Sequence, residues 1–131
     1  PFFIPEKAKH VLEQMTAIIG KPWFHGFITS DEAERRLSLE LNKKPGTFLI
    51  RLSTSEPRSP FAISRVGDDN TITHKRIKVL ADDKGYSVPV RNAGNKVFQS
   101  ILDLVEDPEM RLKTPCPVLT KKKTLYESSD D

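Results

Sequence analysis

The chain has 131 residues, of which 30% are charged, with both signs mixed and a formal net charge of +3. This length suits one domain with its own core, and so weak a basic excess permits an anionic ligand without indicating a nucleic-acid binder. The single cysteine, Cys116, excludes an internal disulfide framework and fits a reducing compartment, so we expect a cytoplasmic protein, or a nuclear one according to its parent. No apolar run approaches the roughly 20 residues of a membrane span. Because the first residue is Pro1 rather than methionine, we expect a piece of a larger multidomain protein.

Residues 6–19 are predicted to form an amphipathic helix, which Pro5 can start and Gly20 can stop. Its apolar stripe consists of Val11, Leu12, Met15, Ile18 and Ile19. Lys21-Pro22 breaks the pattern, so we assign 1–20 to an N-terminal helix with its linker. We expect the stripe to pack on the main domain or on an upstream domain rather than to bind a partner.

A second helix is predicted to open at the capping box Thr29-Ser30-Asp31-Glu32, with Ala33, Leu37 and Leu41 on its inner face. After a turn at 43–46, the strand candidates are Thr47–Ser53, Phe61–Val66, Thr71–Leu80 and Tyr86–Val90. Residues 67–70 have the composition of a hairpin turn.

A third helix is predicted from about Lys96 to Pro108, following a loop at 91–95, with an apolar stripe of Val97, Phe98, Ile101, Leu102 and Val105. The order of elements predicts an α+β fold, in which a central antiparallel β-sheet has a helix on each face and an extra N-terminal helix precedes it. Residues 120–131 are polar and are predicted to form a flexible tail.

The strand that ends at Arg51 indicates a phosphate site. Alternation places Leu49, Arg51 and Ser53 on one face of it, and the same face can receive Ser64 from the next strand and His74 and Arg76 from the third. The loop after the strand adds Thr54, Ser55 and Arg58. A guanidinium offers two parallel N–H donors to phosphate oxygens, which a lysine cannot match. From the residues alone, an internal ion pair between Arg51 and a carboxylate remains the alternative.

Four segments in order resemble the signatures of the Src-homology 2 domain: Trp23-Phe24-His25-Gly26, Ile28-Thr29, the strand 46–51 and His74-Lys75-Arg76-Ile77. The resemblance covers about residues 22–119. It implies a non-enzymatic module without a cofactor that binds phosphotyrosine peptides of partner proteins in signalling.

The resemblance also implies roles for single residues. Arg51 would form the floor of the phosphotyrosine pocket, Ser53 and the loop after it would hold phosphate oxygens, and His74 and Arg76 would flank the aromatic ring. Lys75 and Ile77 would set peptide specificity, and the lysine suggests tolerance of acidic side chains just after the phosphotyrosine. A second, mostly apolar pocket would lie between the loops near 91–95 and 108–113.

One position departs from the family pattern, because Ser30 stands where many members carry a second phosphate-binding arginine. Arg35 and Arg36 are no substitute, since they lie roughly 140° and 120° away around the helix. Arg58 and Arg76 are the candidates to compensate. The departure suggests one alternative, a degenerate module that binds phosphoserine or phosphothreonine. A second alternative is a structural domain that packs a neighbour within a larger kinase or transcription factor, with the 6–19 helix as the connection, and an enzyme is the third.

Other candidate sites are weaker. Cys116 as a phosphatase nucleophile would need an arginine six residues later, where Lys122 stands, so we expect an idle thiol. His10 and His25 have no partner at metal-ligand spacing and are expected to be structural. We expect Lys121–Lys123 to be a solvated tail rather than a nucleic-acid or lipid contact, and Tyr126 an ordinary tail tyrosine rather than a kinase substrate.

Overall fold

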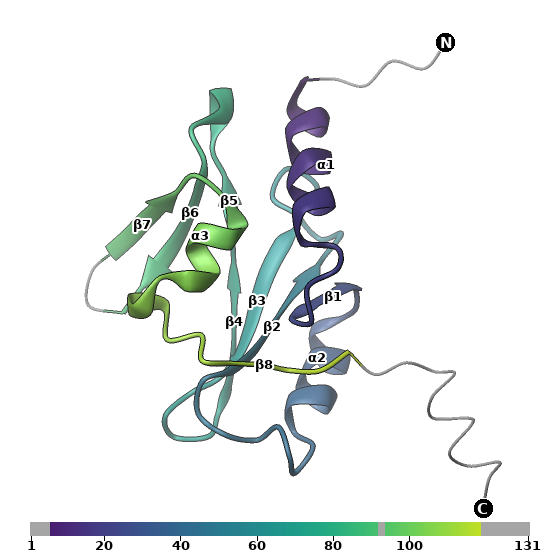
Figure 1. The fold of residues 1–131 in the computed structure, drawn as a ribbon, viewed down its shortest axis with the longest axis vertical. Coiled ribbons are helices and arrows are strands. Elements are labelled where there is room, and N and C mark those ends of the chain that lie inside the picture. Colours follow the sequence, from purple (N-terminus) through teal and green to yellow (C-terminus); the bar gives the residue numbers. More distant parts are fainter. Residues whose placement is uncertain (1–5, 92–93, 119–131) are drawn as a thin grey trace, which may run out of the picture.

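Two sheets and three α-helices make up the domain in a computed structural model that describes residues 6–91 and 94–118 (Figure 1). The helices are α1 (Glu6–Ile18), α2 (Ser30–Leu37) and α3 (Ile101–Glu106), with two short 3-10 helices, η1 (Ala81–Asp83) and η2 (Pro108–Met110). The strands are β1 (Phe24–Phe27), β2 (Thr47–Leu52), β3 (Phe61–Val66), β4 (Ile72–Arg76), β5 (Lys78–Val79), β6 (Tyr86–Val90), β7 (Gly94–Phe98) and β8 (Thr114–Pro115).

The main sheet has the order β1-β2-β3-β4, and its three longest strands pair antiparallel, as predicted. The edges differ from the prediction, because β1 and β8 both run parallel to β2. Register places Leu49 opposite Ser64 and Ser64 opposite His74. A second sheet has the order β5-β6-β7. The predicted convergence of side chains from three neighbouring strands is therefore confirmed at the level of the backbone.

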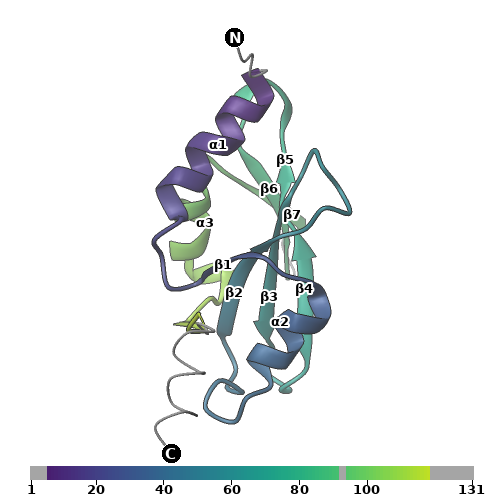
Figure 2. The same ribbon diagram turned by 90° about the vertical axis from the view of Figure 1, so that its right-hand side faces the viewer.

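The helices cover both faces of the main sheet, which confirms the predicted α+β architecture. Figure 2 shows α2 on one side of the strands and α1 with α3 on the other. Ala33 and Leu37 of α2 pack with Leu49 of β2 in one cluster. The larger cluster lies under the opposite face and takes the alternate residues of β2, including Phe48 and Ile50. Burial of both faces explains why every residue of β2 is buried.

Helix α1 packs on the rest of the domain, against α3 and η1. Ile18 is fully buried, whereas Leu12 and Ile19 are exposed, so only part of the predicted stripe faces the core. The side chain of Val11 lies outside the described part of the structure. The backbone N–H of Ile101 donates to Gln14 Oε1 at 3.2 Å, which gives the N-terminus of α3 a partner from α1.

Two predicted helices have the wrong extent. Residues 94–98 form β7, which pairs antiparallel with β6, and α3 begins only after Ser100, whose Oγ accepts from Asp103 N at 3.0 Å. The prediction of a helix from about Lys96 was therefore wrong. Helix α2 ends at Leu37, and Leu41 beyond it is 88% exposed rather than on an inner face. The predicted strand 71–80 is divided into β4 and β5.

Some sequence predictions fall outside the described residues, namely the tail 120–131 with Lys121–Lys123 and Tyr126, and the side chain of His10. Among the helices that the structure describes, none combines the length and the apolar character needed to cross a membrane.

Candidate functional site

Arg51 lies on β2, on the face that α2 covers, and only 6% of it is exposed. Its Nε donates to Ser64 Oγ at 3.1 Å, and its Nη1 makes a long contact of 3.4 Å with the carbonyl of Ile28. Within residues 6–91 and 94–118 no carboxylate pairs with Arg51, so the internal ion pair considered from the sequence is not formed. Burial lowers the pKa of Arg51, and the positive charge of Arg76 lowers it further.

Ser64 and His74 extend this site toward α2. Ser64 is fully buried, and its Oγ lies 2.7 Å from His74 Nδ1. The other ring nitrogen, Nε2, lies 2.8 Å from Glu34 Oε2. Glu34 was missed in the sequence analysis. The signal was present, because Glu34 follows Ser30 by four residues and therefore lies on the same helix face.

Arg76 joins the loop after β2 to the site. Its Nη1 donates to the carbonyl of Ser59 at 2.9 Å, and its Nη2 donates to Ser55 Oγ at 2.5 Å and to Ser53 Oγ at 3.3 Å. The two hydroxyls are also 2.9 Å from each other. The structure thus brings together six of the predicted site residues: Arg51, Ser53, Ser55, Ser64, His74 and Arg76.

Thr54 and Arg58 differ from these six residues, because both are exposed and neither makes a side-chain hydrogen bond to a described residue of the site. Lys75 points away from the Arg51 face and donates to the carbonyl of Pro89 at 3.1 Å. Burial lowers the pKa of Lys75, and the nearby charge of Arg65 adds to this. Ile77 is fully buried in the larger core cluster, so it offers no surface to a peptide and acts through packing.

The two arginines at the end of α2 are engaged elsewhere. Arg35 and Arg36 both bind Glu32, at 2.6 Å and 2.9 Å. The hydrogen bonds from Arg35 and then from Arg36 lower the pKa of Glu32 to about 2. Ser30 is the first residue of α2 and is half-buried. Neither arginine therefore takes the position that Ser30 leaves without a guanidinium.

His25 and Cys116 are engaged in contacts within the fold rather than in a reactive site. His25 Nε2 lies 2.7 Å from the carbonyl of Cys116, while Arg36 Nη1 lies 2.8 Å from the other ring nitrogen. Burial lowers the pKa of His25 and raises the pKa of the Cys116 thiol to about 11. A thiol with so high a pKa is a poor nucleophile. No group of His, Cys, Asp and Glu side chains in the described ranges could hold a metal ion.

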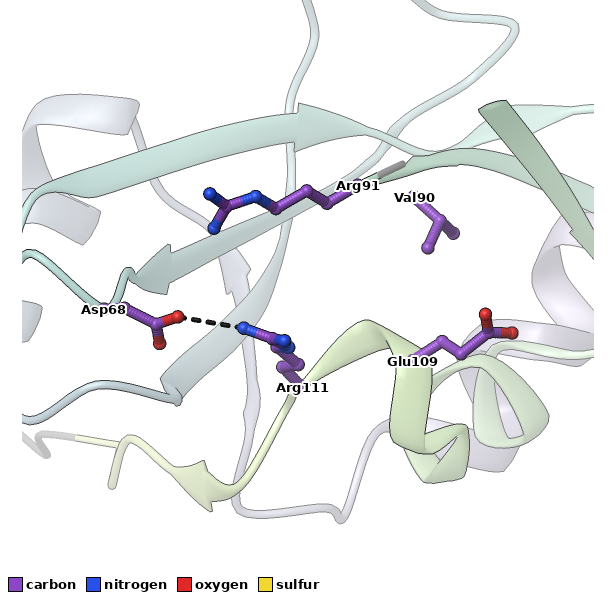
Figure 3. A pocket seen from close by; sticks show the side chains of 5 residues that line it. All are labelled: Asp68, Val90, Arg91, Glu109 and Arg111. Carbon is purple, nitrogen blue, oxygen red and sulfur yellow. Dashed lines mark hydrogen bonds and ion pairs between the residues drawn. The ribbon is translucent and has the colours of Figure 1, made fainter. Parts of the chain in front are cut away.

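A pocket of about 480 Å³ lies between the end of β6, the β3–β4 turn and η2 (Figure 3). Its lining residues are Asp68, Val90, Arg91, Glu109 and Arg111. The pocket adjoins the loops that were expected to shape a second, mostly apolar pocket. Only Val90 in its described lining is apolar, and residues 92–93 of the first loop lie outside the described structure, so the expected apolar pocket stays a prediction.

The charges of this pocket are unequally paired. Asp68 binds Arg111 at 2.9 Å, and Glu109 binds Lys96 outside the lining. Arg91 extends into the same space and forms no ion pair with any residue that the structure describes (Figure 3). Each carboxylate that lines the pocket is therefore paired, whereas Arg91 forms no ion pair with a described residue there. Hydrogen bonds from Thr71 chiefly lower the pKa of nearby Asp69, and the charge of Arg91 contributes to this.

Comparison with known proteins agrees with this geometry. Residues 23–107 match the SH2 domain family. The chain is 32% identical over 125 residues to the dual specificity protein kinase shkD of Dictyostelium discoideum, an alignment that covers 92% of this chain and 16% of the kinase. It is 35% identical over 99 residues to the tyrosine protein-kinase src-1 of Caenorhabditis elegans, with 72% of this chain and 17% of that protein covered.

A third relative, the tyrosine-protein phosphatase corkscrew of Drosophila virilis, is 39% identical over 84 residues, which are 64% of this chain and 10% of the phosphatase. The chain spans no more than about a fifth of the length of the first curated relatives that it matches. The match is to a non-catalytic binding domain, so the kinase and phosphatase activities belong to other parts of those proteins. From the family match and these relatives together, the chain belongs to the SH2 domain family.

Proposed function

We propose that this domain binds phosphotyrosine in peptides of partner proteins, and that Arg51 is its principal phosphate ligand. SH2 domains are in general phosphotyrosine-binding modules of signalling proteins. The observation that carries the proposal for this chain is the state of Arg51, a guanidinium that is 6% exposed and has no carboxylate partner among the described residues. A buried charge without a counter-ion is costly to the free protein. A phosphate with a charge of about −1.5 to −2 supplies that counter-ion.

The hydrogen bonds of the site leave room for a phosphate. Arg51 uses Nε and, weakly, Nη1 for contacts within the domain, and Nη2 makes no hydrogen bond to a described residue. Arg76 supplies the second guanidinium, and its hydrogen bonds hold the hydroxyls of Ser53 and Ser55 beside it. This arrangement supports Arg76, rather than Arg58, as the replacement for the arginine that is missing at Ser30.

The depth of the site favours phosphotyrosine over phosphoserine and phosphothreonine. Arg51 projects from a strand in which every residue is buried. A phosphate on a tyrosyl ring extends farther from the peptide backbone than a phosphate on a serine or threonine, so only the longer side chain reaches a recessed guanidinium. The degenerate module considered from the sequence is therefore the less favoured reading.

Binding to three matched peptide libraries tests the proposal. Phosphotyrosine, phosphoserine and unphosphorylated libraries are titrated against the wild type, Arg51→Ala and Arg35→Ala. Removing one partner of a buried charge pair weakens binding by roughly 2–5 kcal/mol, which is at least about 30-fold. Arg35→Ala removes the same charge from an exposed ion pair and should bind like the wild type. Equal binding of the three libraries, or an Arg51→Ala variant that binds like the wild type, would contradict the proposal.

As part of the same function, we propose that the peptide carries an acidic side chain on the C-terminal side of the phosphotyrosine. The support is the pocket of Figure 3, where Asp68 and Glu109 are already paired and Arg91 forms no ion pair with a described residue. Lys75 adjoins this pocket, since its ammonium group donates to the carbonyl of Pro89, next to the lining residue Val90. Opposite charges at such a rim act on specificity and association rate more than on total affinity.

A further inference from the structure

Four side chains form a continuous series of hydrogen bonds from the surface of α2 to Arg51, and the donors and acceptors in the series can be assigned. A guanidinium only donates, so Ser64 Oγ accepts the hydrogen of Arg51 Nε at 3.1 Å. The hydroxyl proton of Ser64 then goes to the remaining neighbour of that oxygen, His74 Nδ1 at 2.7 Å. In this arrangement Nδ1 is the unprotonated nitrogen of the ring. The ring hydrogen lies on Nε2, which donates to Glu34 Oε2 at 2.8 Å.

From this series we infer that Glu34 is a positioning residue of the phosphate site, acting on Arg51 through His74 and Ser64. The inference rests on the proposed function, because it concerns how the site that binds phosphotyrosine is held ready. Glu34 fixes His74 as the Nε2–H tautomer in one ring orientation. That tautomer makes Ser64 a donor to the ring and leaves its oxygen free to accept from Arg51. The terminal nitrogens of the guanidinium then face the ligand.

Without Glu34 the ring is anchored only at its Ser64 end. It can then turn over, which places a carbon atom against Ser64, or it can carry its hydrogen on Nδ1. In the second case Ser64 Oγ accepts two hydrogens and its own hydroxyl proton has no partner, although Ser64 is fully buried. A buried polar hydrogen without an acceptor is costly, so the hydroxyl would compete for other arrangements and loosen the hold on Arg51. Glu34 removes these alternatives.

The exposure and charge of Glu34 distinguish this positioning role from two simpler ones, a contribution to fold stability and a purely electrostatic effect on the ligand. Its side chain is 50% exposed and that of His74 is 24% exposed, so the pair is too solvated to matter much for the stability of the fold. Its negative charge also opposes an anionic ligand. If Glu34 acted only through its charge, every neutral replacement would tighten binding. If it positions His74, a glutamine rescues the function, because its amide oxygen can accept the same hydrogen, and an alanine does not.

The experiment compares Glu34→Gln, Glu34→Ala and the control Asp31→Ala, which removes a negative charge from an exposed position of the same helix. The first readout is the 15N–1H correlation spectrum of the His74 ring in the free domain, assigned with a His74→Asn variant. We expect the Nε2–H tautomer in the wild type and in Glu34→Gln, and a mixture of tautomers in Glu34→Ala. The second readout is affinity for a phosphotyrosine peptide selected from the library.

For the peptide, we expect Glu34→Gln and Asp31→Ala to bind within about twofold of the wild type or more tightly, and Glu34→Ala to bind about fivefold or more weakly. An Nδ1–H tautomer in the wild type, or equal affinities of the alanine and glutamine variants, would overturn the inference. If even the wild type failed to bind phosphotyrosine, the proposed function would fall, while the ring spectra would still decide whether Glu34 sets the tautomer of His74.

Discussion

Replacing Arg51 by methionine should stabilise the free domain while it abolishes phosphate binding. In the absence of ligand, Arg51 is a charged group with 6% exposure and no carboxylate partner in the described structure. Burial and the charge of Arg76 both lower its pKa, which shows that the surroundings disfavour the charged form. Methionine keeps an unbranched apolar stem in the same place and removes the charge.

The magnitude follows from two opposing changes. Removing a buried and unpaired ion relieves a penalty of several kcal/mol. Against this stands the loss of one charge-assisted hydrogen bond to Ser64, which contributes about 1.5–3 kcal/mol, and of a long contact with Ile28 that contributes little. Ser64 keeps its hydrogen bond to His74, so no buried hydroxyl is left without a partner. The net expectation is a gain of about 1–2 kcal/mol, or a rise in Tm of about 5 °C.

Urea denaturation with and without a phosphotyrosine peptide measures both effects. Without peptide, Arg51→Met should unfold at higher urea concentration than the wild type with an unchanged slope. With peptide at about 100 times its Kd, the wild type gains about 2.7 kcal/mol and the variant gains nothing, so the order reverses.

Arg65→Met is the matched control for these measurements. Arg65 also has its pKa lowered by burial, but it bonds to the carbonyl of Arg111 and faces Asp68 at 3.8 Å, so this change should destabilise the domain. A loss of about 1 kcal/mol or more in Arg51→Met would refute the reasoning, because it would show that contacts within the free domain already compensate the charge.

Three further changes test other parts of the structure. Hydrogen bonds, first from Arg35, lower the pKa of Glu32 to about 2, so its contribution to stability is complete above the unfolded pKa near 4.5 and disappears as the pH falls through about 2. In urea titrations the wild type should be more stable than Glu32→Gln by about 1 kcal/mol after allowance for solvent screening, and this difference should shrink between about pH 5 and pH 2. Gly85→Ala should cost at least about 2 kcal/mol in the same assay, because Gly85 has φ +105° and a Cβ there would overlap the carbonyl of Phe98; a smaller loss would mean that the β6–β7 pairing adjusts. We expect the wild type to bind peptides with Glu after the phosphotyrosine about fivefold more tightly than the same peptides with Gln. Arg91→Ala should remove this preference and leave the affinity for the Gln peptides unchanged. Retention of the preference would place the acidic side chain elsewhere.

The centre of the site could be predicted from the sequence because it depends on local geometry. Strand alternation alone puts Arg51, Ser64, His74 and Arg76 on one face once three neighbouring strands pair in register, and the burial of β2 on both sides allows only one register. Glu34 was harder to find, because its contact with His74 depends on how α2 lies across the sheet. Helix periodicity places Glu34 on the same face as Ser30, but the contact was missed because periodicity gives no distance to β4.

The errors occurred where distant segments decide the structure. The apolar spacing around Val97, Phe98 and Ile101 fits a helix, but the pairing of residues 94–98 with β6 draws the first part into a strand, and only the N-cap at Ser100 marked the boundary locally. The lining of the pocket combines Arg91, Glu109 and Arg111 from the two predicted loops with Asp68, which comes from a turn more than 20 residues before Arg91. No local pattern connects Asp68 with those loops.

The bond between Gln14 and Ile101 joins the first helix of the chain directly to α3. Together with the buried side chain of Ile18, it fixes α1 to α3 and to the larger core cluster. Helices α1 and α3 both lie on the side of the main sheet away from α2 (Figure 2). The residues of the candidate phosphate site lie between the sheet and α2, so a change that loosens α1 or α3 would act on the face of the sheet opposite that site.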